Sequence, residues 1–188
     1  AELLEVVCDP VHSLVFALTS DGVLDAWDTT TCKRVGKAPF LCVSPETHPS
    51  EEARPLPRSL AKRMLSIYPR QQILYLDTAG RALYVNTTCG DRCIRVHELS
   101  GLSRIKRLKL ALPKMRSFGK RGFWDAPDAS GLMDPRWCSD GALDKFVAAP
   151  HEGCIVGSVV GDDRVYAFDL ASGDIRRVFC GHARDVNC

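Results

Sequence analysis

The sequence lacks the features that mark membrane-spanning and strongly charged proteins. No apolar run approaches the roughly 18 residues that identify a transmembrane helix. The 25 basic and 23 acidic side chains leave a formal net charge of +2, too small to predict a nucleic-acid or membrane partner by itself. The chain starts with neither a methionine nor a basic-then-apolar leader. We therefore expect no membrane association, and a processed chain or a fragment.

The usual catalytic signatures are also missing. The sequence has no P-loop and no G-x-G-x-x-G, H-E-x-x-H or G-x-S-x-G motif. The turn acids Asp21 and Asp162 stand apart rather than forming a catalytic pair. The histidines show no paired spacing: His12, His48, His97, His151 and His182. We predict that the protein is not an enzyme and has no catalytic residue, cofactor or metal site.

Cysteine, in contrast, is abundant. The nine cysteines are odd in number and scattered, unlike a disulfide framework. We interpret most of them as small buried apolar residues of an intracellular protein, either cytoplasmic (cytoskeleton and cilium included) or nuclear. Cys89 and Cys93, followed by His97, leave three interpretations open. These are a plain turn, a zinc site with a remote fourth ligand, and a redox pair.

One pattern recurs three times, as in repeat architectures. Its first copy has an apolar strand from Leu14, a turn at Asp21-Gly22 and a second strand ending at Trp27-Asp28. An Asp-Gly pair at a hairpin tip supplies the positive φ of a tight turn. Aligned without gaps, 73–76 and 156–159 fall on the first strand of this copy. Val85-Asn86 and Phe168-Asp169 fall on its Trp-Asp pair.

Each copy is flanked by further apolar segments that would complete four strands. The expected first strands are 3–8, 64–68 and 143–148, and the expected fourth strands are 32–35, 93–99 and 175–180. Short strands rich in Val, Leu, Ile and aromatic residues, separated by turns, predict antiparallel meanders.

These segments resemble the WD-repeat family of β-propellers. The resemblance rests on the Asp21-Gly22 turn with Trp27-Asp28, on Gly161-Asp162 with Phe168-Asp169, and on Gly181-His182, which looks like the opening of a further repeat. It covers roughly 2–40, 62–99 and 143–188. It implies an all-β, propeller-like fold of four-stranded antiparallel blades, in which His182 bonds a turn Asp.

The expected organisation follows from these boundaries. It has blade 1 at 1–40, a Pro-rich loop at 41–61, blade 2 at 62–99, a basic and Gly/Pro-rich insertion at 100–142, blade 3 at 143–180, and the start of a further blade at 181–188. Propellers usually close with four to eight blades, and one blade cannot bury its own faces. We therefore expect an incomplete ring, from a larger WD-repeat protein or covered by other subunits.

The insertion begins with a strongly basic run that contains no acid between 103 and 121. Its candidate partner-binding residues are Arg104, Lys106, Arg107, Lys109, Lys114, Arg116, Lys120 and Arg121. A solvated face, an acidic protein partner and RNA are the three interpretations left open, and the low net charge makes RNA the weakest. Apolar residues partly alternate with the basic ones over 104–112, so one side could be buried in an edge strand or a short helix.

The expected function is a non-enzymatic WD-repeat scaffold for protein–protein interactions within a larger multi-subunit assembly. One alternative is a regulatory propeller of a larger enzyme or of a ciliary or cytoskeletal protein. The other is an RNA-associated subunit of a ribonucleoprotein. The expected partners are other protein subunits, with contacts concentrated on the insertions rather than on the strands.

Overall fold

The computed structural model describes residues 3–19, 22–39, 72–88, 92–113, 142–159 and 162–181. Almost all the regular structure in these residues is β-strand. The strands are β1 (Leu3–Asp9), β2 (Leu14–Thr19), β3 (Val23–Asp28), β4 (Lys33–Pro39), β5 (Leu74–Asp77), β6 (Ala82–Asn86), β7 (Cys93–Glu98), β8 (Arg104–Lys109), β9 (Leu143–Ala149), β10 (Cys154–Val159), β11 (Val165–Asp169) and β12 (Ile175–Phe179). A short 3-10 turn, η2 (Pro150–Glu152), joins β9 to β10.

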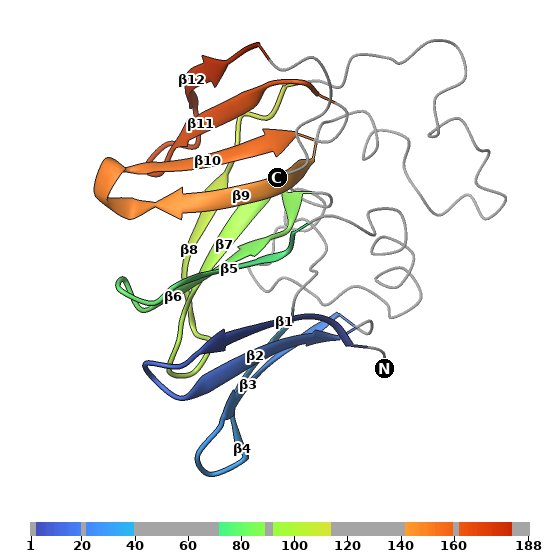
Figure 1. Ribbon diagram of the computed structural model, residues 1–188, viewed down its shortest axis with the longest axis vertical. Coiled ribbons are helices and arrows are strands. Elements are labelled where there is room, and N and C mark those ends of the chain that lie inside the picture. The colour runs from blue at the N-terminus through green and yellow to red at the C-terminus, as the bar shows by residue number, and fades with distance from the viewer. Residues whose placement is uncertain are drawn as a thin grey trace, which may run out of the picture.

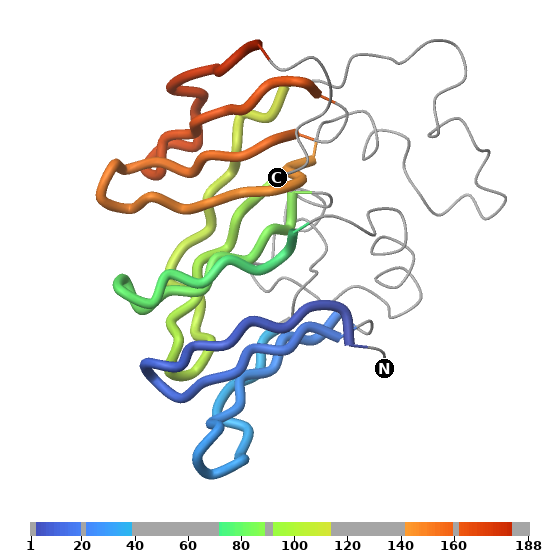
Figure 2. Tube along the Cα trace, viewed as in Figure 1, coloured from blue at the N-terminus to red at the C-terminus, as the bar shows by residue number. Residues whose placement is uncertain are grey.

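In the described residues, the strands form three four-stranded antiparallel sheets, each made of consecutive strands. We call β1–β4 the first sheet, β5–β8 the second and β9–β12 the third. The second sheet lies between the other two, and the row of sheets does not close into a ring (Figure 1). The chain runs up and down within each sheet before it passes to the next (Figure 2). The expected fold class, all-β and propeller-like with an incomplete ring, is confirmed.

The three sheets share one pairing register. The first residue of each second strand pairs with the last residue of each third strand: Leu14 with Asp28, Ala82 with Glu98, and Cys154 with Asp169. The pairing of the third strand with the fourth is irregular at the same place in every sheet, where it skips Val35, Ile105 and Arg176. A bulge bends a strand and increases its twist, so the shared position gives the sheets the same local shape.

Two turns of each sheet repeat as well. A left-handed residue with φ between 53° and 62° precedes each second strand, and these residues are Ser13, Arg81 and Gly153. Another, with φ between 55° and 83°, lies in each turn between the third and fourth strands, at Cys32, Leu102 and Gly173. Only Gly adopts this conformation without steric cost, yet four of these six positions hold other residues. The shared register and turns make the sheets three copies of one unit.

The second sheet differs from its predicted strand order. Residues 73–76 were expected to form a second strand, but β5, which holds most of them, is the first strand of its described sheet. The predicted fourth strand at 93–99 is the third strand, β7, and residues 104–109, expected in the insertion, form the fourth strand, β8. The place of Trp27-Asp28 is therefore taken by His97-Glu98 and not by Val85-Asn86. The expected strand at 64–68 and the Pro-rich loop at 41–61 lie outside the described residues.

The other two sheets follow the predicted strand order. The fourth strand of the first sheet, expected at 32–35, runs from Lys33 to Pro39. β1, β9 and β12 lie within a residue of their expected ends. Of the turn residues behind the resemblance, Gly22 and Asp162 are described, whereas Asp21, Gly161 and His182 lie outside the described residues.

Two apolar cores hold the sheets together. The first joins the first and second sheets through Leu14, Phe16, Leu18, Leu24, Leu74, Leu83 and Val85. The second joins the second and third sheets through Tyr84, Ile94, Leu108, Phe146, Ile155 and Phe168. Alternate side chains of a strand point to opposite faces, so β6 contributes Leu83 to one core and Tyr84 to the other. Each large apolar side chain buried in this way stabilises the fold by about 1.5–3 kcal/mol.

Candidate protein-interaction surfaces

Strand β8 carries the described part of the predicted basic site. Arg104, Lys106, Arg107 and Lys109 lie on this strand, at the outer end of the second sheet. Lys114, Arg116, Lys120 and Arg121 lie outside the described residues. The structure therefore brings four of the eight predicted residues together on one strand. The sequence left open an edge strand or a short helix with one buried side. β8 is such an edge strand, because Leu108 points into the second core.

The four basic side chains do not all face solvent equally. Arg104, Arg107 and Lys109 are exposed, whereas Lys106 is half-buried and its Nζ donates a hydrogen bond to the carbonyl of Leu170, 2.5 Å away. Charged residues on an outer strand also discourage pairing with a foreign strand, so this charge has a structural role besides any role in binding. The exposed positive groups of β8 are thus Arg104, Arg107 and Lys109.

At both junctions, a residue of the fourth strand of one sheet contacts the turn that follows the third strand of the next sheet. Leu170 lies in the turn between β11 and β12, so Lys106 connects the fourth strand of one sheet to a turn of the next. The first sheet makes the same kind of contact at Gly36. A Cβ built on Gly36 would lie 2.9 Å from the backbone carbon of Gly101, in the turn between β7 and β8. Gly36 and Lys106 occupy the same register position, opposite Ala26 and Val96.

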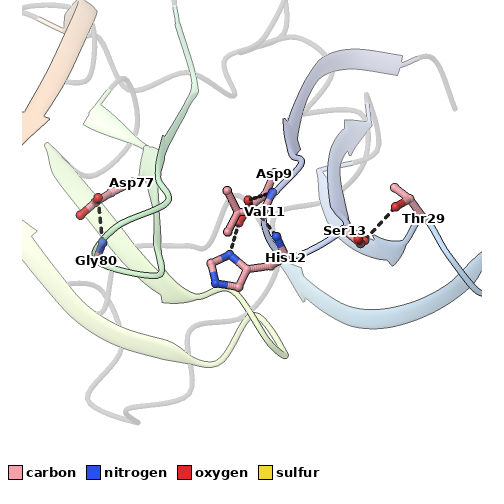
Figure 3. A network of polar contacts seen from close by, with 7 residues as sticks. All are labelled: Asp9, Val11, His12, Ser13, Thr29, Asp77 and Gly80. Carbon is pink, nitrogen blue, oxygen red and sulfur yellow. Dashed lines mark hydrogen bonds and ion pairs between the residues drawn. The ribbon is translucent and has the colours of Figure 1, made fainter.

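Polar side chains close the turns at the ends of the first strands (Figure 3). Asp9 is buried and accepts hydrogen bonds from the backbone N–H groups of Val11 and His12, at 3.0 and 3.2 Å. Its other oxygen lies 2.7 Å from His12 Nδ1. Burial alone would raise the pKa of Asp9, but the hydrogen bonds from His12 outweigh it and hold this pKa below its usual value.

The neighbouring turns use related contacts. The carboxylate of Asp77, the last residue of β5, accepts the N–H of Gly80 at 2.9 Å. Thr29 donates both its N–H and its hydroxyl to the carbonyl of Ser13, at 2.8 and 3.1 Å (Figure 3). Neither Asp9 nor its pairing with His12 was predicted from the sequence. The signal was an Asp at a strand end with a His three residues later. These side chains satisfy local backbone groups, which is a structural role.

Asn86, expected in the place of a blade-ending Asp, instead ties the second sheet to the third. Its Nδ2 donates to the carbonyls of Gln72 and Leu143, both at 2.9 Å. Its Oδ1 accepts the hydroxyl of Thr88 at 2.6 Å, and the N–H of Leu143 donates to that same hydroxyl. Asn86 and Thr88 are buried, so this network replaces water in the centre of the molecule.

Asp162, just before β11, forms a close ion pair with Arg164. Both of its oxygens accept from Arg164, at 2.7 and 2.8 Å, and one also accepts the Tyr166 hydroxyl at 2.8 Å. The hydrogen bonds from Arg164 are the main reason that the pKa of Asp162 falls from 3.8 to about 2. The expectation that Asp162 is a turn acid agrees with this geometry, since Arg164 and Tyr166 belong to the same hairpin.

The proposed zinc and redox interpretations of Cys89 and Cys93 rest partly on Cys89, which lies outside the described residues. Cys93 is buried at the start of β7. His97 is buried too, and its Nδ1 lies 2.8 Å from the carbonyl of Leu102. Burial lowers the pKa of His97, which favours the neutral ring. Among the described residues, no group of three His, Cys, Asp or Glu side chains is arranged to hold a metal ion.

The first sheet exposes apolar residues at positions that are buried in the other sheets. Trp27 is 40% exposed, while the residues in its register position, His97 and Phe168, are 5% and 0% exposed. Val6 is 42% exposed, and its equivalents Leu74 and Phe146 are 1% and 2% exposed. We call this surface the open face of the first sheet. Its apolar residues are Val6, Cys8, Val15, Ala17 and Trp27, and Asp25, which pairs with Ala17, lies on the same face.

The third sheet has an open face as well, at the opposite end of the row. Phe179 is 45% exposed, whereas its equivalents Ala38 and Leu108 are 5% and 3% exposed. Val147 is 52% exposed, although its equivalents Val7 and Tyr75 pack against the two cores. The open face of the third sheet consists of Val147, Val156 and Phe179, together with Ala167, which lies on the same face but is only 6% exposed.

No helix in the part of the chain that the structure describes is both long enough and apolar enough to cross a membrane.

The comparisons with known proteins support the fold. No family model and no curated protein matches this chain. Among solved structures, the chain is similar to the crystal structure of the computationally designed Ika8 protein, with a TM-score of 0.51 and 10% identity. The match covers 100% of this chain but only 39% of that one, so this chain spans well under half the length of the designed protein. Matches extend to 720 solved chains, so the arrangement is common and points to no single function.

Proposed function

We propose that this chain is a non-enzymatic WD-repeat scaffold that joins other protein subunits in a larger intracellular assembly. The observation that carries the proposal is the basic strand β8, on which Arg104, Arg107 and Lys109 are exposed. Clustered charge of one sign on a surface attracts partners of the opposite charge. The resemblance of the Trp27-Asp28 and Phe168-Asp169 units to WD repeats supports the family assignment.

The exposed charge of β8 supports an acidic subunit as one of the partners. Arg104 and Arg107 present guanidinium groups, which bind carboxylates through two parallel hydrogen bonds. The second sheet holds β8 through its pairing with β7, so these groups project from a rigid support. An acidic surface would meet them without ordering a flexible segment, which lowers the entropic cost of binding.

A charge-reversal experiment tests this proposal. Arg104→Glu with Arg107→Glu, both on β8, is compared with Lys33→Glu with Arg81→Glu. The second pair changes the net charge equally at two other exposed sites, the start of β4 and the turn before β6. Proteins that co-purify with each variant from cells are quantified at low and moderate salt. We expect the β8 variant to lose an acidic subunit about tenfold at low salt, because like charges then face each other.

The control variant should retain that subunit, and treatment with ribonuclease should leave its recovery unchanged. Circular dichroism of both variants checks that they fold alike. Equal recovery of every co-purifying protein with the two variants would contradict an acidic partner at β8. Loss of the partner on ribonuclease treatment would favour the RNA alternative instead.

A further inference from the structure

Each junction between sheets is built from two different kinds of face. At the first junction, Val7, Phe16, Ala26 and Ala38 of the first sheet meet Leu74, Leu83 and Val85 of the second. At the second junction, the same register positions of the second sheet, Tyr75, Tyr84, Val96 and Leu108, meet Phe146, Ile155 and Phe168 of the third. We call the face that holds Val7, Phe16, Ala26 and Ala38, and its equivalent in the other sheets, the leading face. We call the face that holds Leu74, Leu83 and Val85, and its equivalent in the other sheets, the receiving face.

The two open faces are one of each kind. Val147, Val156, Ala167 and Phe179 of the third sheet occupy the register positions of a leading face. Val6, Val15 and Trp27 of the first sheet occupy those of a receiving face. The open faces are therefore unlike each other and have the same complementary arrangement that the chain already uses at its two internal junctions.

We propose that two copies of this chain associate head to tail, with the leading face of each third sheet packed on the receiving face of the first sheet of the other copy. The same contact forms twice, so the sheets that the structure describes, three in each copy, would close into a ring of six. Six lies within the four to eight blades of known propellers, and unlike faces that close by rotation give rings rather than fibres. This inference does not depend on the proposed scaffold function.

The turn contacts provide a second reason for this pairing. Inside the chain, Lys106 of one fourth strand donates to the carbonyl of Leu170 in the following turn. Arg177 holds the register position of Lys106, and Thr29 follows Asp28 as Leu170 follows Asp169. Arg177 and Thr29 are both exposed. In the head-to-tail pair, the Arg177 guanidinium would donate to the Thr29 carbonyl of the second copy.

The mass of the chain in solution tests the proposal. We expect sedimentation equilibrium of the wild type to give twice the monomer mass at micromolar concentrations. Val6→Arg with Trp27→Arg blocks the receiving face, and Val147→Arg with Phe179→Arg blocks the leading face, so each variant should be monomeric. Val11→Arg with Ile105→Arg is the matched control, because Val11 and Ile105 are 71% and 62% exposed away from both open faces. The control should remain a pair.

Mixing the two monomeric variants separates this arrangement from its alternatives. Each variant keeps one intact face, so the mixture should form a one-to-one complex, at least about tenfold weaker than the wild-type pair because only one contact remains. Recovery of this complex also shows that the variants are folded.

Four results would overturn the proposal. They are a monomeric wild type at every concentration, polymers that grow with concentration, dissociation by only one of the two blocking variants, and failure of the mixed variants to pair. The scaffold proposal is tested on β8, which lies outside both open faces, so the two proposals can fail separately.

Discussion

In the second sheet, His97 and Leu74 are buried, whereas Trp27 and Val6 are exposed at the same register positions of the first sheet. Trp27 is larger and more apolar than His97, so hydrophobicity does not explain which of them is covered. The difference lies in the neighbours, because the second sheet has a sheet on each side and the first has one only. In stacked repeats, each unit gains much of its stability from adjacent units.

The largest contrast should come from truncating one register position in two sheets. Phe168→Ala removes a fully buried ring from the second core and should lower the free energy of unfolding by about 3–5 kcal/mol. Trp27→Ala removes a ring that is already 40% exposed and should cost about 1 kcal/mol at concentrations where the chain is monomeric. Urea unfolding of both variants measures the difference. Equal losses would mean that the open face is covered by the chain itself.

A smaller contrast is expected from two glycines in corresponding turns. A Cβ on Gly173 would lie 1.8 Å from the carbonyl oxygen of Lys109, and the φ of Gly173 is +83°. Gly173→Ala should therefore lower the free energy of unfolding by about 2–3 kcal/mol through the clash and the strained φ. Gly101→Ala has no atom within 4 Å of its new Cβ and should change stability by less than about 0.5 kcal/mol. Thermal unfolding distinguishes the two, and a neutral Gly173→Ala would refute close packing of this turn on β8.

The smallest contrast concerns two turn acids. Asp162→Asn removes the charge that pairs with Arg164 and should cost about 2 kcal/mol at neutral pH, in line with the lowering of the pKa from 3.8 to about 2. Asp28→Asn keeps an acceptor for the N–H groups of Thr30 and Thr31, so it should cost less.

The pH dependence of Asp162 has a definite sign. Because folding lowers the pKa of this carboxyl, its stabilising effect is complete above about 4 and is lost as the pH falls towards 2. Urea unfolding from neutral pH to about pH 2 should therefore bring the wild type and Asp162→Asn together in acid. A gap between them that stays constant with pH would contradict the ion pair.

The first and third sheets were predictable because in each an apolar strand and a turn are followed by a third strand that ends in an aromatic residue and Asp, namely Trp27-Asp28 and Phe168-Asp169. The second sheet has no such ending, since His97-Glu98 stands in that place. The apolar run at 73–76 is as similar to the second strand of the first sheet as to its first strand. The gapless alignment therefore assigned a first strand to the place of a second strand. Burial on both faces explains the slip, because the β6 residues are all buried and show no alternation.

The basic strand and the open faces needed the structure. β8 carries four Arg and Lys residues among six, a composition that predicts a loop more readily than a strand. The left-handed turn positions at Ser13, Arg81, Cys32 and Leu102 contain no glycine and so leave no mark in the sequence. The matching of leading and receiving faces appears only once the strand pairs are known, because a shift of one residue exchanges the two faces of a strand.

Each sheet is built from four consecutive strands that contain both kinds of face. A gene segment encoding one such sheet would therefore carry everything needed to join the array at either end. Duplication or loss of that segment would lengthen or shorten the array by a whole sheet and still place a leading face against a receiving face at every junction. The shared register thus lets such an array change size in evolution by repacking side chains at one junction, without a change in strand order.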